Sequence, residues 1–317
     1  MVTVPTIGDR SHYLSREVEE FISWLATERG RSLNTLSSYR RDIGKYETFL
    51  SSSGIGIKQA SPELLVSFVH SLLSEGLKPT TVARHVAAIR GLYSFLEQEG
   101  YMTDNPARHL RRPILPRALP KALDEQEVQK LIESAKGRDP VHLRDTAILE
   151  VLYGTGMRIS ELVGVCLNDI DWDGSMVVVM GKGRRERLVP LGKYARQALL
   201  EWIGPNGRQH LVSSRWTRNK DKDAVFLSLR GRRLTRQGVW CIVRHYGELT
   251  GMTDRLTPHV LRHSCATHML EHGADIRIVQ ELLGHVSIAT TQVYTKVSAE
   301  HLRYEYEKAH PRASGLI

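Results

Sequence analysis

Cysteine is scarce in this sequence, and the residues present form no recognisable framework. Cys166, Cys241 and Cys265 are odd in number, far apart and without any Cys-x-x-Cys spacing. Neither a disulfide scaffold nor a thiolate zinc site is therefore predicted. This pattern suits a reducing cytoplasm.

Long apolar runs are also missing. No stretch approaches the roughly 18 apolar residues of a membrane span, and the first ten residues lack the charged start and apolar run of a secretory signal. A G-x-x-x-x-G-K-[ST] loop is absent, as are the acidic clusters typical of two-metal nucleases. We therefore expect a soluble, cytoplasmic protein that needs no metal and no nucleotide cofactor.

Acidic residues are outnumbered by basic ones. The 44 Lys and Arg against 35 Asp and Glu give a formal charge of +9 and a sequence pI of about 9.5. This balance favours a polyanionic partner, nucleic acid first, although a basic globular protein with merely solvated charges fits composition equally well. A length of 317 residues favours two domains.

Residues 15–100 show the apolar periodicity of four amphipathic helices, which predicts a helical N-terminal domain over residues 1–112. Each predicted helix ends at a glycine, the residue that best tolerates left-handed backbone. The polar faces and the segment that follows carry basic residues that are either solvated surface or DNA contacts. These candidates are Arg40, Arg41, Arg84, Arg90, Arg111 and Arg112.

Residues 113–120 read as a linker, because three prolines and the arginines around them favour an extended, solvated chain. The second domain, residues 121–317, is predicted to be mostly helical. Alternating and β-branched residues over 167–190 predict a small antiparallel sheet inside it. Residues 205–223 are polar, basic and without periodicity, and read as a long surface loop.

Two candidate active-site residues lie in turns. Arg158 follows Gly156 at the mouth of a predicted helix, where Glu161 is able to brace the turn, and Lys182 lies in a glycine-flanked β-turn. An isolated arginine in such a turn is most often an ordinary surface residue. Alone, this signal is weak.

A stronger cluster begins at Pro258, which starts a helix whose i, i+3 spacing brings His259 and Arg262 together. Downstream, His285 ends a helix and Tyr294 follows nine residues later. Taken separately, these residues have structural explanations: His259 and Arg262 could form the polar face of a helix, and Tyr294 could be a core residue. Their order and spacing together raise the set above coincidence.

These residue types suit attack on a phosphodiester. A phenol has a pKa of ~10, so Tyr294 needs a base, for which His259 is the candidate, or a cationic pocket. Guanidiniums offer paired donors to phosphate oxygens as charge grows on them, a task for Arg158 and Arg262. In the same scheme Lys182 protonates the leaving 5'-oxygen and His285 donates a hydrogen bond to the phosphate.

His268 and His272 lie at i, i+4, a spacing that zinc ligands share. No third ligand and no H-E-x-x-H pattern accompanies them, so a structural role is favoured.

The ordered set resembles the tyrosine recombinase (phage integrase) family, most closely its Xer-type members, over nearly the whole chain. The matching motifs are G-x-R-x-S-E, a lysine in a β-hairpin, H-x-L-R-H, L-G-H and a following tyrosine. The resemblance implies a catalytic set of Arg158, Lys182, His259, Arg262, His285 and Tyr294, the last as nucleophile. Two departures are a basic loop that looks longer than usual and Lys296 where Xer-type sequences often have histidine.

The resemblance also implies a SAM-like core-binding domain, a 3'-phosphotyrosine intermediate and double-stranded DNA with paired inverted half-sites. It implies a tetramer on DNA, of one chain or with a paralogue, in which a C-terminal exchange helix docks into a neighbour. The residues alone leave open that this helix, predicted over 298–309, packs on its own domain. The role implied is chromosome dimer resolution or integration and excision. A type IB topoisomerase-like enzyme, a noncatalytic DNA-binding protein and a His-rich metallohydrolase are the alternatives.

Overall fold

The structure, a computed structural model, describes residues 14–113, 122–181, 186–212, 221–284 and 296–313. The chain divides into two compact units, Met1–Ala118 and Leu119–Ile317, each with its own hydrophobic core. Within the described ranges, no helix is long and apolar enough to cross a membrane.

The N-terminal unit consists of helices, as its periodicity predicted. They are α1 (Arg16–Thr27), α2 (Leu33–Ser52), η1 (Ile57–Gln59), α3 (Pro62–Ser74) and α4 (Pro79–Gln98). Gly30, Gly54, Gly76 and Gly100 all have positive φ, which confirms their predicted position at helix ends. In the core, the hydroxyls of Tyr46 and Tyr93 lie 2.7 Å apart, and Tyr93 also donates to the Ile57 carbonyl.

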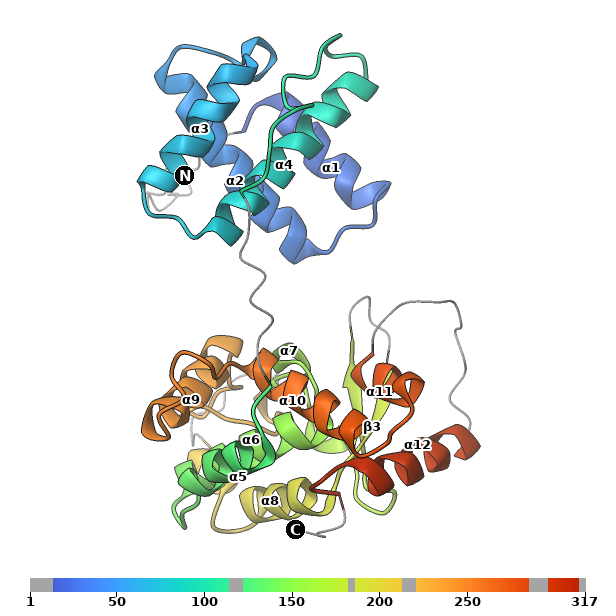
Figure 1. Ribbon diagram of the computed structural model, residues 1–317. Coiled ribbons are helices and arrows are strands. Elements are labelled where there is room, and N and C mark those ends of the chain that lie inside the picture. Colours follow the sequence, from blue (N-terminus) through green and yellow to red (C-terminus); the bar gives the residue numbers. More distant parts are fainter. Residues whose placement is uncertain (1–13, 114–121, 182–185, 213–220, 285–295, 314–317) are drawn as a thin grey trace, which may run out of the picture. The chain divides into compact units, whose positions relative to one another are not determined.

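The C-terminal unit is mainly helical with one small sheet (Figure 1). Its helices up to the sheet are α5 (Glu125–Ser134), α6 (Pro140–Thr155), α7 (Ile159–Leu162) and η2 (Leu167–Asp169). Those beyond the sheet are α8 (Lys193–Ile203), η3 (Arg208–Leu211), α9 (Arg236–Leu249), α10 (Pro258–Glu271), α11 (Ile276–Leu283) and α12 (Lys296–Ala309). Helix α6 forms the centre, because it is buried from Ala147 to Thr155 and packs on both α8 and α10.

The sheet has the predicted antiparallel form, in the order β1 (Ile170–Asp171), β2 (Met176–Met180) and β3 (Glu186–Pro190). Val178 pairs with Leu188, and Val179 pairs with Arg187. Side chains alternate along β3, so Arg187 and Val189 are both buried while Glu186 is exposed. A charged residue therefore occupies a core position of this strand.

The segment 205–223 differs from the predicted surface loop in its described part. It contains the short helix η3, and Arg208 is buried. The Arg208 guanidinium donates to the carbonyls of Ala224 and Lys222. Composition could not reveal these two contacts, because backbone carbonyls are present in any sequence.

Helix α12 packs on its own unit. Leu302 and Tyr306 are buried, and the Tyr306 hydroxyl donates to the Gly154 carbonyl at 2.8 Å. Beyond the helix, Arg312 forms an ion pair with buried Glu150. Removing residues after 297 would therefore open the core, and the docking of this helix into a neighbouring subunit stays a prediction.

His310 gives this tail a dependence on pH. It is buried, stacked on Tyr306 and against Tyr153. Burial, aided by the nearby charge of Arg312, lowers the pKa of His310 to about 3. In the unfolded chain His310 has its ordinary pKa of 6.5, so only the unfolded state gains a proton as the pH falls below 6.5. The contribution of His310 to stability is therefore complete above pH 6.5 and is lost as the pH falls toward and through the folded-state pKa.

We expect His310→Gln to flatten the fall in stability between pH 7 and pH 5. The difference should reach roughly 2 kcal/mol, because 1.36 kcal/mol accompanies each pH unit below the unfolded pKa. Thermal and urea unfolding of the full chain at both pH values would measure it. His263→Gln is the control, since His263 is exposed. Equal pH dependence in wild type and His310→Gln would contradict the assignment.

Candidate active site

Arg158 lies where α6 ends and α7 begins. Helix α6 stops at Gly156, which has φ +59°, and Arg158 is the N-cap residue of α7, as predicted. A Cβ at Gly156 would lie 2.8 Å from Leu283 Cδ2 and 3.2 Å from Cys265 Sγ. Only glycine allows this turn to approach α10 and α11 so closely.

Glu161 braces the turn, as the sequence suggested. Its Oε2 accepts from the Arg158 backbone N–H at 2.7 Å, and its Oε1 accepts from Arg158 Nη1 at 2.9 Å. Arg187 donates to both carboxylate oxygens at 2.8 Å. Burial opposes ionisation of Glu161, but the hydrogen bonds from Arg187 and Arg158 outweigh it and lower the pKa of the carboxyl.

Arg262, on α10, joins the same cluster from the core side. Only 8% of the residue is exposed, and its guanidinium donates to the carbonyls of Gly156 and Leu283 at 2.5 Å each. Burial, aided by the charges of Arg158 and Arg187, lowers the pKa of Arg262 to about 10. Arg262 is therefore still a cation at neutral pH.

The C-terminal end of α11 is where these arginines meet. A helix leaves its last carbonyls without partners inside the helix, and here three consecutive ones are bound by arginine. Arg187 Nε donates to Leu282 O at 3.1 Å, Arg262 to Leu283 O, and Arg158 Nη2 reaches Gly284 O at 3.5 Å. The residue that follows in the chain is His285.

The cluster carries excess positive charge. Two guanidiniums, of Arg158 and Arg187, pair with the Glu161 carboxylate, and the Arg262 guanidinium lies near them, so the four groups together have a net charge of +2. A phosphate diester carries one negative charge and would be attracted to this group. Arg158, whose side chain is 36% exposed, offers the accessible donors.

His259 lies in the first turn of α10, which begins at Pro258 and is capped by the Thr257 hydroxyl. In contrast to Arg262, His259 is exposed. The other predicted residues, Lys182, His285 and Tyr294, lie outside the described residues. The structure therefore brings together Arg158 and Arg262.

Arg187 was missed as a site residue from the sequence, where it served only as part of a predicted strand. A signal was present, because alternation along Arg187-Leu188-Val189 puts the arginine on the face of a core valine. A charge at such a position needs a buried partner.

The predicted DNA-contacting arginines of the N-terminal unit are exposed. Two are held by carboxylates: Arg40 pairs with Glu19, and Arg84 makes two contacts, of 2.9 and 3.0 Å, with buried Asp42. Arg41 donates to the Ser37 carbonyl. The other three exposed candidates are Arg90, Arg111 and Arg112. Their contact with DNA stays a prediction.

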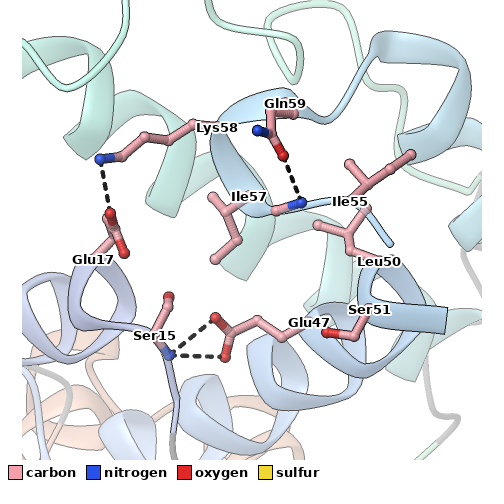
Figure 2. A pocket seen from close by; sticks show the side chains of 10 residues that line it. Ser15, Glu17, Glu47, Leu50, Ser51, Ile55, Ile57, Lys58 and Gln59 are labelled. Atoms are coloured by element: carbon pink, nitrogen blue, oxygen red, sulfur yellow. Dashed lines mark hydrogen bonds and ion pairs between the residues drawn. The ribbon is translucent and has the colours of Figure 1, made fainter. Parts of the chain in front are cut away.

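A hollow of about 330 Å³ on the N-terminal unit is a poor phosphate site. Figure 2 shows Glu47 turned toward the backbone N–H of Ser15, and Glu17 paired with Lys58. Two carboxylates in the lining disfavour an anion, and Lys58 already pairs with one of them, Glu17.

The two histidines considered for zinc contact different groups of the protein. His268 is buried, with Nδ1 2.8 Å from the Tyr153 hydroxyl, whereas His272 contacts the Ala309 carbonyl and Glu125. Among the residues placed by the structure, no group of three or more His, Cys, Asp or Glu residues could hold a metal ion.

Comparisons with known proteins agree with this architecture. Residues 18–100 match the phage integrase N-terminal SAM-like domain, and residues 121–301 match the phage integrase family. Tyrosine recombinase XerD of Yersinia pestis is 43% identical over 297 residues, which are 93% of this chain and 97% of that protein. XerD of Halalkalibacterium halodurans is 40% identical over 302 residues, or 95% and 99% of the two chains.

Solved structures share the fold at lower identity. The XerH site-specific recombinase bound to difH substrate has a TM-score of 0.62 and 21% identity, covering 93% of this chain and 82% of that one. The Tn1549 transposon integrase in complex with circular intermediate DNA has a TM-score of 0.69 and 17% identity, covering 90% and 98%.

Fold and relatives together define a site-specific tyrosine recombinase, an enzyme that cleaves and rejoins DNA strands. The chain belongs to the phage integrase family, as the resemblance of its motifs predicted.

Proposed function

We propose that Tyr294 is the nucleophile of this recombinase and forms a 3'-phosphotyrosine link. The observation that carries the proposal is the meeting of Arg158 and Arg262 at the end of α11, one position before His285. Gly284, the last described residue before His285, contacts both Arg158 and Arg187. A phosphate bound by Arg158 would therefore lie near this end of α11.

Each remaining residue has a role in this proposal. Arg158 and Arg262 stabilise the charge that grows on the non-bridging oxygens, and His259 accepts the tyrosine proton. His285 donates a hydrogen bond to the phosphate, and Lys182 protonates the leaving 5'-oxygen. The phosphotyrosine ester stores the energy of the broken bond, so rejoining needs no nucleotide.

We further propose that residues 1–112 bind the DNA core site, residues 113–120 act as the linker, and residues 121–317 carry the chemistry. On paired inverted half-sites the chain would act in the cytoplasm as a tetramer, either alone or with a paralogue. Chromosome dimer resolution is favoured over integration and excision. Support comes from similarity over almost the full chain to XerD proteins of bacteria as different as Yersinia and Halalkalibacterium.

Covalent trapping tests this function. Duplexes with two inverted, randomised arms are first enriched for those that the protein binds, and a nick is then placed near the centre. Cleavage next to the nick releases a short fragment. Because the fragment carries away the 5'-hydroxyl that rejoining needs, the protein stays linked to the DNA. We expect a protein–DNA band that survives denaturation and forms in excess EDTA.

Three results would contradict the proposal. Absence of the band from every enriched duplex would rule out the covalent chemistry. Relaxation of supercoiled plasmids that lack the selected site would favour the topoisomerase-like alternative. An EDTA-sensitive cleavage without any covalent band would favour a metallohydrolase.

A further inference from the structure

Arg187 lies beneath the candidate site and is shielded from the solvent, with 7% of the residue exposed. Each of its three guanidinium nitrogens donates a hydrogen bond: Nη1 and Nη2 to the Glu161 carboxylate, and Nε to the Leu282 carbonyl. Its side chain also covers Gly284, because a Cβ there would lie 3.2 Å from Arg187 Cδ. Arg187 therefore touches both the brace of Arg158 and the end of α11.

Such burial is not explained by stability alone. A buried ion pair gains little over well-packed apolar residues, since both charges lose their hydration. A strand position beside Val189 would accept a leucine or methionine. The fork geometry of arginine, in contrast, fixes the carboxylate in one plane.

The geometry limits how Arg158 can pair. Arg187 occupies both oxygens of Glu161 at 2.8 Å, so the Arg158 side chain makes one contact with it, from Nη1 at 2.9 Å. The Arg158 Nη2 contact with Gly284 is long, at 3.5 Å. Without Arg187, the carboxylate would be free to take the Arg158 guanidinium in a two-point pair and withdraw it from a phosphate.

We propose that Arg187 is a positioning residue for strand cleavage: by holding Glu161 and the end of α11, it keeps the Arg158 guanidinium available to the phosphate. The inference rests on the proposed function. Because Arg187 is shielded from the solvent, its loss should slow the chemical step and leave binding nearly unchanged.

The test compares Arg187→Met and Arg187→Lys with wild type, using half-site binding and the single-turnover rate of covalent trapping. We expect binding within threefold of wild type. Cleavage should fall at least tenfold in Arg187→Met and less in Arg187→Lys, which keeps the charge but not the fork. The double variant Glu161→Gln with Arg187→Met should cleave no slower than Arg187→Met, because the competing carboxylate is gone.

Arg208→Met is the matched control, since Arg208 is also a buried arginine of this unit that binds carbonyls, of Ala224 and Lys222. If Arg208→Met loses as much cleavage at a similar melting temperature, the effect is general destabilisation and the inference is wrong. Undiminished cleavage by Arg187→Met, with wild type forming the adduct, overturns this inference alone. No adduct from wild type overturns the proposed function and this inference with it.

Discussion

Tyr294→Phe should form no covalent adduct on a nicked site that wild type cleaves, while its affinity for that site stays within about twofold. The change removes a single oxygen and keeps the ring, so packing and charge are preserved. A phenol with a pKa of ~10 is the only group of that side chain able to attack phosphorus. Denaturing gels after overnight incubation would measure the adduct.

Tyr304→Phe is the matched control, because Tyr304 is an exposed tyrosine, 62% accessible, on α12. It should form the adduct at the wild-type rate. If Tyr294→Phe forms the adduct and Tyr304→Phe does not, the nucleophile is Tyr304 and the proposal is wrong. An adduct from both would place the nucleophile elsewhere.

The helices of the N-terminal unit could be predicted because their signals are local. Apolar periodicity marks the buried face of each helix, and a glycine such as Gly76 ends a helix through its own backbone preference. The sheet of the C-terminal unit was equally predictable, since β2 is a run of β-branched residues next to a turn.

The candidate site was only partly predictable. Arg158, Glu161 and Gly156 lie in one turn, so their relation could be inferred from spacing. Arg187 and Leu282 are 95 residues apart, and the Arg187 side chain reaches the Leu282 carbonyl only in the folded unit. Spacing carries no information about such a contact. Partners of this kind, backbone carbonyls above all, leave no mark in a sequence.

The end of the chain shows the same limit. The sequence allowed α12 either to pack on its own domain or to reach a neighbour. In the described structure the helix packs on its own unit, because the Tyr306 hydroxyl donates to the Gly154 carbonyl. The hydroxyl also lies against Gly192, where an added Cβ would clash with it. An exchange between subunits would have to involve other residues or displace this contact.

Arg262→Ala and Arg158→Ala should each lower single-turnover cleavage at least a hundredfold, with half-site affinity reduced less than tenfold. Each guanidinium stabilises charge that develops mainly in the transition state, and loss of such a donor commonly costs about 3 kcal/mol. The two variants should differ in stability. Arg262 is buried and binds two carbonyls, of Gly156 and Leu283, whereas Arg158 is partly exposed.

Arg262→Lys separates these effects, because it keeps a buried cation but loses the two-point fork. We expect it to fold better than Arg262→Ala and still to cleave far more slowly than wild type. Arg244→Ala is the control, since Arg244 is an exposed arginine of the same unit that pairs with Glu248. If binding and cleavage fall equally in Arg158→Ala, that arginine is an ordinary phosphate contact, and transition-state stabilisation must come from other groups.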